Sequence, residues 1–120
     1  VIEGQKYPHH IFFDNYETFA FVDIGKTIHQ QGSIRNLFSI LTRSAPSNLL
    51  HIHHRAPVAL TETQWEQWLD DKQGENSLLK IMQSTQPAWT VYQVSSKVNS
   101  TRNNDPDVLI AEKGKQSLLL

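Results

Sequence analysis

Hydrophobic and polar positions in the first half of the chain change over short distances, a pattern typical of β-strands. Residues 10–13 (His-Ile-Phe-Phe) and 16–23 are separated by the turn-forming pair Asp-Asn, which predicts a β-hairpin. Residues 25–32 are polar and are expected to form a loop. The apolar run at 37–42 (Leu-Phe-Ser-Ile-Leu-Thr) predicts a buried strand, and residues 49–60 are expected to be extended.

The next segment has the periodicity of short helices. Thr61 and Gln64 have the spacing of a capping box, so a helix is predicted to begin at Thr61. Trp65 and Trp68 then fall on one face of that helix, where a core position is more probable than a base-stacking role. A second short helix is expected around residues 78–82.

The last third of the chain returns to extended structure. Residues 89–94 (Trp-Thr-Val-Tyr-Gln-Val) alternate and predict a strand, and residues 95–105 are a polar loop. Asp105 followed by Pro106 predicts the start of a short helix that reaches Ile110. The mixture indicates an α+β fold with antiparallel strands and few helices, and 120 residues predict one domain, 1–120.

Composition narrows the possible functions. The chain has no cysteine, which excludes a disulfide framework, a thiol nucleophile and Cys-ligated zinc within these 120 residues. No apolar run approaches the roughly 18 residues of a membrane span. The formal net charge of −1 excludes a polybasic coat, although a local basic face for nucleic acid remains possible.

The densest group of chemically active residues is at 51–55 (His-Ile-His-His-Arg). In an extended segment His51 and His53 lie on one face, where two imidazoles could bind zinc if a third ligand were near. Acid–base chemistry is a second possibility, because histidine titrates near neutral pH and Arg55 could hold an anion. A third possibility is that these histidines are ordinary polar residues near a sheet edge.

Other polar residues have simpler interpretations. Ser95-Ser96 lacks the glycines of a nucleophile elbow, so a serine nucleophile is excluded. Dispersed cations could form one basic face but usually are only solvated: Arg35, Arg43, Lys97 and Arg102. The asparagines of the polar loop could bind a ligand or could serve as turn residues: Asn99, Asn103 and Asn104.

Three blocks of sequence, in order along the chain, resemble one family. Residues 52–60 (Ile-His-His-Arg-Ala-Pro-Val-Ala-Leu) are similar to an Ile-His-x-Arg-Met-Pro-Val-Ile-Leu block. Residues 94–103 (Val-Ser-Ser-Lys-Val-Asn-Ser-Thr-Arg-Asn) are similar to a Pro-Val-Ser-x-x-Val-Asn-x-x-Arg-Asn block, and residues 37–42 to a Phe-x-Ile-x-Thr strand. The chain thus resembles the SRAP family, the SOS-response-associated peptidases or abasic-site processing proteins.

The resemblance implies a mostly antiparallel β, barrel-like domain with short peripheral helices. It implies binding to single-stranded DNA at abasic sites, without cofactor or metal, and a protective covalent crosslink. In that crosslink the amine and thiol of an N-terminal Cys close a thiazolidine on the sugar aldehyde. A monomer in the cytoplasm, associated with the nucleoid in a bacterium and not with a membrane, is expected.

The resemblance assigns roles to four residues. Glu3 corresponds to the catalytic Glu, although Gly4 stands where the family has a DNA-contacting Trp, and His53 corresponds to the catalytic His. Arg55 and Thr42 correspond to residues that contact the DNA backbone. Next to His53 the chain departs from the family at two positions, with His54 for Asp, Asn or Pro and Ala56 for Met.

The Cys-bearing half of the family has no counterpart in this chain. We therefore expect the C-terminal part of an SRAP domain that carries half of an active site. The alternative is a non-catalytic module of the same fold that binds single-stranded DNA or a partner.

Overall fold

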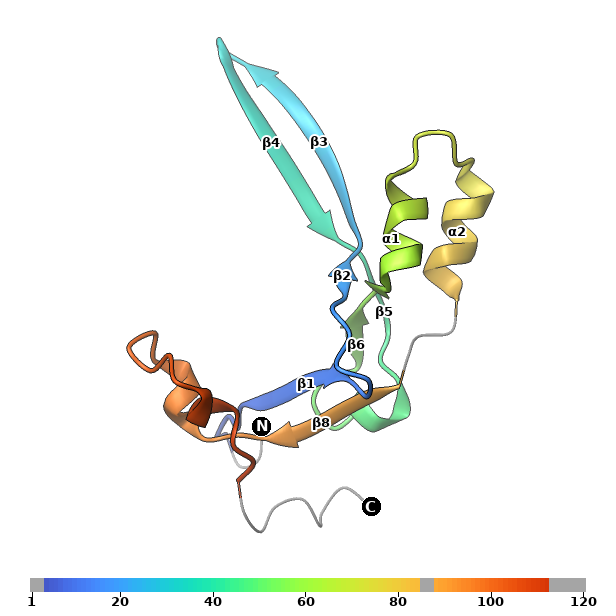
Figure 1. Cartoon of the computed structure of the whole chain (residues 1–120). Coiled ribbons are helices and arrows are strands. Elements are labelled where there is room, and N and C mark those ends of the chain that lie inside the picture. Colours follow the sequence, from blue (N-terminus) through green and yellow to red (C-terminus); the bar gives the residue numbers. More distant parts are fainter. Residues whose placement is uncertain (1–3, 85–87, 113–120) are drawn as a thin grey trace.

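The computed structural model describes residues 4–84 and 88–112 and consists of four two-stranded antiparallel sheets and two short α-helices (Figure 1). Every strand pair is antiparallel, which confirms the expected α+β fold. Within the described residues the sheets do not close into a barrel. No helix in this part of the chain is long and apolar enough to cross a membrane.

Strand β1 (His9–Phe13) pairs with β8 (Trp89–Gln93), in the register Phe13 opposite Trp89. The predicted hairpin of 10–13 with 16–23 is therefore wrong. After a turn in which Tyr16 has a φ of 57°, the chain leaves β1, and β2 (Ala20–Phe21) pairs with β7 (Ala59–Leu60). The aromatic contact between Phe13 and Trp89, with ring centroids 4.2 Å apart, favours the long-range pair.

Strands β3 (Asp23–Gln30) and β4 (Ser33–Ile40) form a long hairpin. The expected loop at 25–32 is thus a strand and its turn. Gln31 and Gly32 have φ angles of 49° and 76°, as in a two-residue type I′ turn, whose twist matches that of the strands. The apolar run at 37–42 is extended as predicted, but Leu37 and Phe38 are exposed, so the prediction that this strand is buried is wrong for them.

The segment predicted to be extended over 49–60 begins differently. A 3₁₀ turn, η1 (Ser47–Leu49), comes first, and the backbone N–H groups of Ile52 and His53 both donate to the Leu49 carbonyl, at 2.9 and 3.1 Å. Only then does β6 (Arg55–Pro57) pair with β5 (Thr42–Ser44). Closing this turn satisfies backbone donors that no neighbouring strand reaches.

Three of the four small sheets, β2–β7, β3–β4 and β5–β6, meet at one junction. The N–H of Val22 donates to the Val58 carbonyl, that of Val58 to the Leu41 carbonyl and that of Leu41 to the Val22 carbonyl, at 2.9, 3.0 and 2.9 Å. Val22 and Val58 pack with Leu60 and Ile81 in the main core cluster. Eight apolar residues are buried in the described part of the chain: Phe13, Val22, Leu49, Val58, Ala59, Leu60, Ile81 and Val94.

Helices α1 (Glu62–Leu69) and α2 (Glu75–Gln83) confirm both predicted helices. Thr61 and Gln64 form the capping box, with the Thr61 N–H donating to the Gln64 side-chain oxygen at 3.0 Å. Trp65 and Trp68 pack against the core cluster, as predicted. Asp105 and Pro106 begin a short helix as expected, although it is the 3₁₀ helix η3 (Pro106–Leu109), which follows η2 (Ser96–Asn99).

Candidate functional site

His53 lies where the chain leaves the η1 turn and enters β6. The turn is fixed on both sides: Asn48 donates to the Trp89 carbonyl at 2.6 Å, and the Ala45 N–H donates to the His54 carbonyl at 3.0 Å. The rings of His53 and His54 are stacked, with centroids 4.4 Å apart and planes 21° apart. Backbone and ring contacts thus fix the position of the His53 imidazole.

The Nδ1 atom of His53 has a partner in both protonation states. The backbone N–H of Arg55 donates to Nδ1 at 3.0 Å, which places the proton of the neutral ring on Nε2. The carbonyl oxygen of Arg55 lies 3.2 Å from the same Nδ1 and can accept from it when the ring is protonated. The Arg55 backbone thus presents both a donor and an acceptor to Nδ1 of His53.

Arg55, at the start of β6, reaches across to Thr42, at the start of β5. Its Nη2 donates to the Thr42 carbonyl at 2.8 Å and to the Thr42 hydroxyl at 3.0 Å, and its Nε to that hydroxyl at 3.3 Å. These contacts occupy at most three of the five guanidinium N–H groups. Thr42 therefore orients an exposed cation that retains donors for a second acceptor.

His53 and Arg55 line an apolar cavity of about 270 Å³ between the η1 turn and β8. Its aromatic wall includes Phe19, Phe21 and Trp89, and the ring centroids of Phe19 and Trp89 are 5.0 Å apart in an edge-to-face arrangement. The site thus combines an imidazole and a guanidinium cation at the edge of an apolar space. That combination suits a ligand with an anionic backbone and an uncharged reacting group.

The structure brings three of the four predicted site residues together. His53, Arg55 and Thr42 are joined by the hydrogen bonds above. Glu3 lies outside the described residues.

The zinc alternative assumed that His51 and His53 share a face of an extended segment, and the turn at 49–53 removes that premise. The His51 ring instead lies against His9, with centroids 5.8 Å apart. In residues 4–84 and 88–112 no three His, Cys, Asp or Glu side chains form a group that could hold a metal ion.

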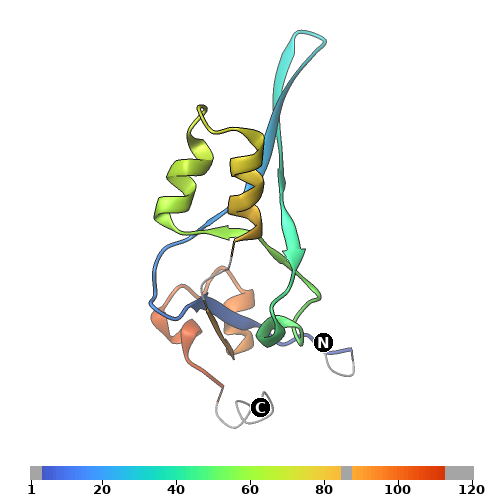
Figure 2. The same ribbon diagram turned by 90° about the vertical axis from the view of Figure 1, so that its right-hand side faces the viewer.

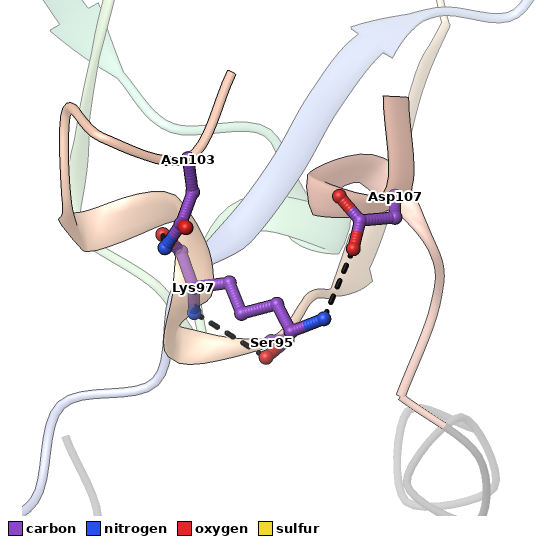
Figure 3. Close-up of polar contacts among 4 residues, drawn as sticks. All are labelled: Ser95, Lys97, Asn103 and Asp107. Carbon is purple, nitrogen blue, oxygen red and sulfur yellow. Dashed lines mark hydrogen bonds and ion pairs between the residues drawn. The ribbon is translucent and has the colours of Figure 1, made fainter. Parts of the chain in front are cut away.

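The polar loop after β8 is held by its own side chains (Figure 3). Lys97 forms an ion pair with Asp107 at 2.9 Å, and the hydrogen bond to Asp107, followed by its charge, raises the pKa of Lys97. Asn103 donates to the Lys97 carbonyl at 2.8 Å, and the Ser95 hydroxyl accepts from the Lys97 N–H at 3.3 Å. Asn103 therefore has the turn role that was one of its two expected interpretations.

The dispersed cations have different environments. Arg43 donates to the carbonyls of Ser84 and Met82 at the end of α2, at 2.9 and 3.4 Å, and so has a structural role. Arg35 lies on β4 in the long hairpin. Only Arg55 of the described arginines lines the cavity beside His53.

Sequence reasoning did not find the aromatic wall of the cavity. Phe19 and Trp89 are 70 positions apart in the chain, and the sequence pattern indicates only that each lies in a strand. The pairing of β1 with β8 brings them together, and no local pattern indicates a pair of such sequence separation.

The chain is similar to known proteins in sequence and in structure. The sequence model of the SOS response associated peptidase (SRAP) family matches residues 2–101. The abasic site processing protein YoqW of Bacillus subtilis is 31% identical over 107 residues, which are 87% of this chain and 48% of YoqW. The abasic site processing protein HMCES of Pongo abelii is 36% identical over 80 residues, 65% of this chain and 22% of HMCES.

A crystal structure of a protein from Bacteroides thetaiotaomicron superposes with a TM-score of 0.73 at 20% sequence identity. The match covers 92% of this chain and 50% of that protein, and it shows that the two share a fold. The chain spans about half the length of YoqW, with 48% of that relative matched. The family match over residues 2–101 shows that the chain belongs to the SOS response associated peptidase (SRAP) family.

Proposed function

We propose that this chain takes part in processing abasic sites in single-stranded DNA, with Arg55, Thr42 and His53 as its contribution to the reacting centre. The observation that carries the proposal is the Arg55 guanidinium, bound by Thr42 and adjacent to His53 at the edge of the apolar cavity. All three residues lie in the segment that the SRAP family matches. The names of YoqW and HMCES support abasic sites as the substrate class.

Arg55 is proposed to bind the phosphate that flanks the lesion. A guanidinium offers paired donors that match two phosphate oxygens, and the donors not used by Thr42 are available for them. Contacts to phosphate position a strand without selecting its sequence. Such contacts suit damage that arises at any base.

His53 is proposed to open the sugar ring. An abasic deoxyribose is mainly a closed hemiacetal. Opening it requires a proton on the ring oxygen as the bond from that oxygen to the anomeric carbon breaks, while the anomeric hydroxyl gives its proton to water. The protonated His53 can donate from Nε2, and the neutral ring that remains keeps its proton on Nδ1, where the Arg55 carbonyl can accept it. The product is the aldehyde that a nucleophile can attack.

The covalent step is proposed to need a thiol from outside these 120 residues. An amine adds to the aldehyde carbon, water leaves, and a thiol then adds to the resulting imine to close a thiazolidine. These 120 residues contain no cysteine, so we propose that the thiol belongs to a segment equivalent to the half of YoqW that they do not match. Glu3 is proposed to orient the attacking amine and to relay its proton.

DNA binding tests the role of Arg55. Fluorescence anisotropy with a single-stranded oligonucleotide that carries a tetrahydrofuran abasic analogue measures the affinity of this chain. We expect salt-dependent binding that Arg55→Ala weakens about tenfold, the effect of losing one charged hydrogen-bonding contact. Arg35→Ala is the matched control and should bind like the unchanged chain. Equal affinities for the Arg55 and Arg35 variants would exclude the phosphate role.

Crosslinking tests the role of His53. A chimera in which this chain replaces the matching segment of YoqW supplies the rest of the domain, and denaturing gels follow its covalent capture of an abasic oligonucleotide. His53→Ala should slow capture roughly 10²- to 10⁴-fold while DNA binding persists, because general acid catalysis contributes that range. His51→Ala should leave the rate unchanged. An unchanged rate in the His53 variant would contradict the proposal.

A non-catalytic module that binds single-stranded DNA is the second candidate, because the exposed Arg55 guanidinium can bind a phosphate without any reaction at His53. The two candidates differ in the chimera. If His53→Ala leaves capture unchanged while Arg55→Ala weakens binding, the chain binds DNA without acting in the chemistry.

A further inference from the structure

The β3–β4 hairpin projects from the rest of the molecule as an arm. In both views it extends beyond the α1–α2 pair, and no helix or sheet lies against its outer half (Figures 1 and 2). Both of its edges are free, since β3 and β4 form a two-stranded sheet and pair with no other described strand. Free edges on eight-residue strands leave backbone donors and acceptors available to another chain.

Both faces of this arm carry apolar side chains. Every second residue of a strand lies on the same face, so Ile34, Phe38 and Ile40 of β4 lie on one face. Phe38 is 71% exposed and Ile34 is 66% exposed. Ile24 and Leu37, both also exposed, lie on the other face. A hairpin that is apolar on both faces is typical of strands inside a layered core, whereas a solvated arm would be polar on at least one face.

The surface area and the size of the chain also indicate that part of its surface is normally covered. The chain exposes 9531 Å², against about 6,600 Å² for a compact protein of its mass. Its radius of gyration is 17.8 Å, against about 14 Å for a compact domain of this length. The excess, about 2,900 Å² on this chain alone, is several times the roughly 800 Å² that each partner buries in a standard interface.

A second copy of the chain would not cover both faces of this arm. A two-fold dimer that packs one face of the arm against its equivalent leaves the other face exposed. On the face with Leu37, it would also bring Lys26 and Arg35 toward their own copies. The occupant has to cover two faces and two edges together.

We propose that the β3–β4 hairpin is the docking surface for a polypeptide equivalent to the half of the SRAP relatives that this chain does not match. The match covers 48% of YoqW and 50% of the Bacteroides structure, so that half is about as long as this chain. It adds strands to the free edges and apolar side chains to both faces. The proposal concerns the surface and holds whether that polypeptide is joined to this chain or separate.

Association in trans tests the proposal. The probe is the unmatched segment of YoqW, produced as a separate polypeptide and mixed with this chain. Sedimentation should show a 1:1 complex, and hydrogen exchange should show protection of the amides at 23–40 on binding. Phe38→Asp should raise the dissociation constant at least tenfold. Because Phe38 is exposed, the variant should keep the circular dichroism of the unchanged chain.

Leu69→Asp is the matched control, because Leu69 is 77% exposed at the end of α1, and it should bind the probe normally. Three results would overturn the proposal. The first is no complex, or a complex that Phe38→Asp does not weaken. The second is a dimer of this chain with the same protected amides, which assigns the arm to a second copy. The third is equal protection by single-stranded DNA alone, which assigns it to nucleic acid. None of these results depends on Arg55, so the test is separate from that of DNA binding.

Discussion

Arg55 contacts both Thr42 and the imidazole of His53, the two groups that the proposed chemistry uses beside it. Its side chain is held by Thr42, and its backbone N–H and carbonyl both face Nδ1 of His53. The resemblance to the family selected these three residues, but the composition and spacing of 51–55 alone left zinc and ordinary polar roles open. The hydrogen bonds between them depend on the turn at 49–53, which the sequence pattern did not predict.

Lys97 offers a prediction that is independent of DNA. Asp107 raises its pKa above the ordinary value of 10.5, chiefly through a hydrogen bond. A raised pKa stabilises the folded loop fully below pH 10.5, and the effect is lost as the pH rises through the folded-state value. Asp107→Asn should lower the pKa of Lys97 in an NMR titration of its side chain. Asp105→Asn should lower it less, because Asp105 contributes the weaker, purely electrostatic effect.

The sequence predicts which segments form helices and strands better than it predicts which strands pair with each other. Both helices and the strands at 10–13 and 89–94 were identified, because capping and alternation are local. The pairing of β1 with β8 was missed, because it joins residues about 80 positions apart. The β3 strand was missed because its residues are mainly polar and its turn is Gln-Gly, without the Asn-Gly or Asp-Gly sequence that marks such hairpins.

Arg43 of β5 binds the end of α2, and this contact between two elements gives a prediction about stability. Its guanidinium donates to the Ser84 and Met82 carbonyls, which the last turn of the helix leaves unpaired. Arg43→Ala should lower the free energy of unfolding by about 1.5–3 kcal/mol, the range for a hydrogen bond to a charged group. Chemical denaturation followed by tryptophan fluorescence measures the change. Arg35→Ala, on the hairpin, should change it little, and an equal loss in both variants would contradict this role.

At the scale of the whole molecule, the main difference from expectation is the missing barrel. The family resemblance implied a compact barrel-like domain, whereas the described residues form small sheets around one junction with a projecting arm. The buried strand predicted at 37–42 is informative here. Its apolar pattern indicates an environment that this chain alone does not provide, since Leu37 and Phe38 are exposed.

Dye binding gives a prediction for the whole chain. The isolated chain should enhance the fluorescence of a hydrophobic dye such as ANS, because its apolar side chains are exposed on two faces of the arm. Ile34→Asp combined with Phe38→Asp should reduce that fluorescence substantially, and Leu69→Asp should reduce it little. Fluorescence that is equal in all three proteins would place the dye-binding surface elsewhere.

The two free edges of the arm also have a consequence for how the chain behaves during synthesis and storage. Unpaired strands with exposed apolar residues are templates for growth of intermolecular sheets, and edge lysines or prolines usually prevent this. Here Lys26 is the one lysine in the two strands, and neither strand contains proline. Aggregation of the chain should therefore rise steeply with concentration, so the covering polypeptide has to be present while the chain folds.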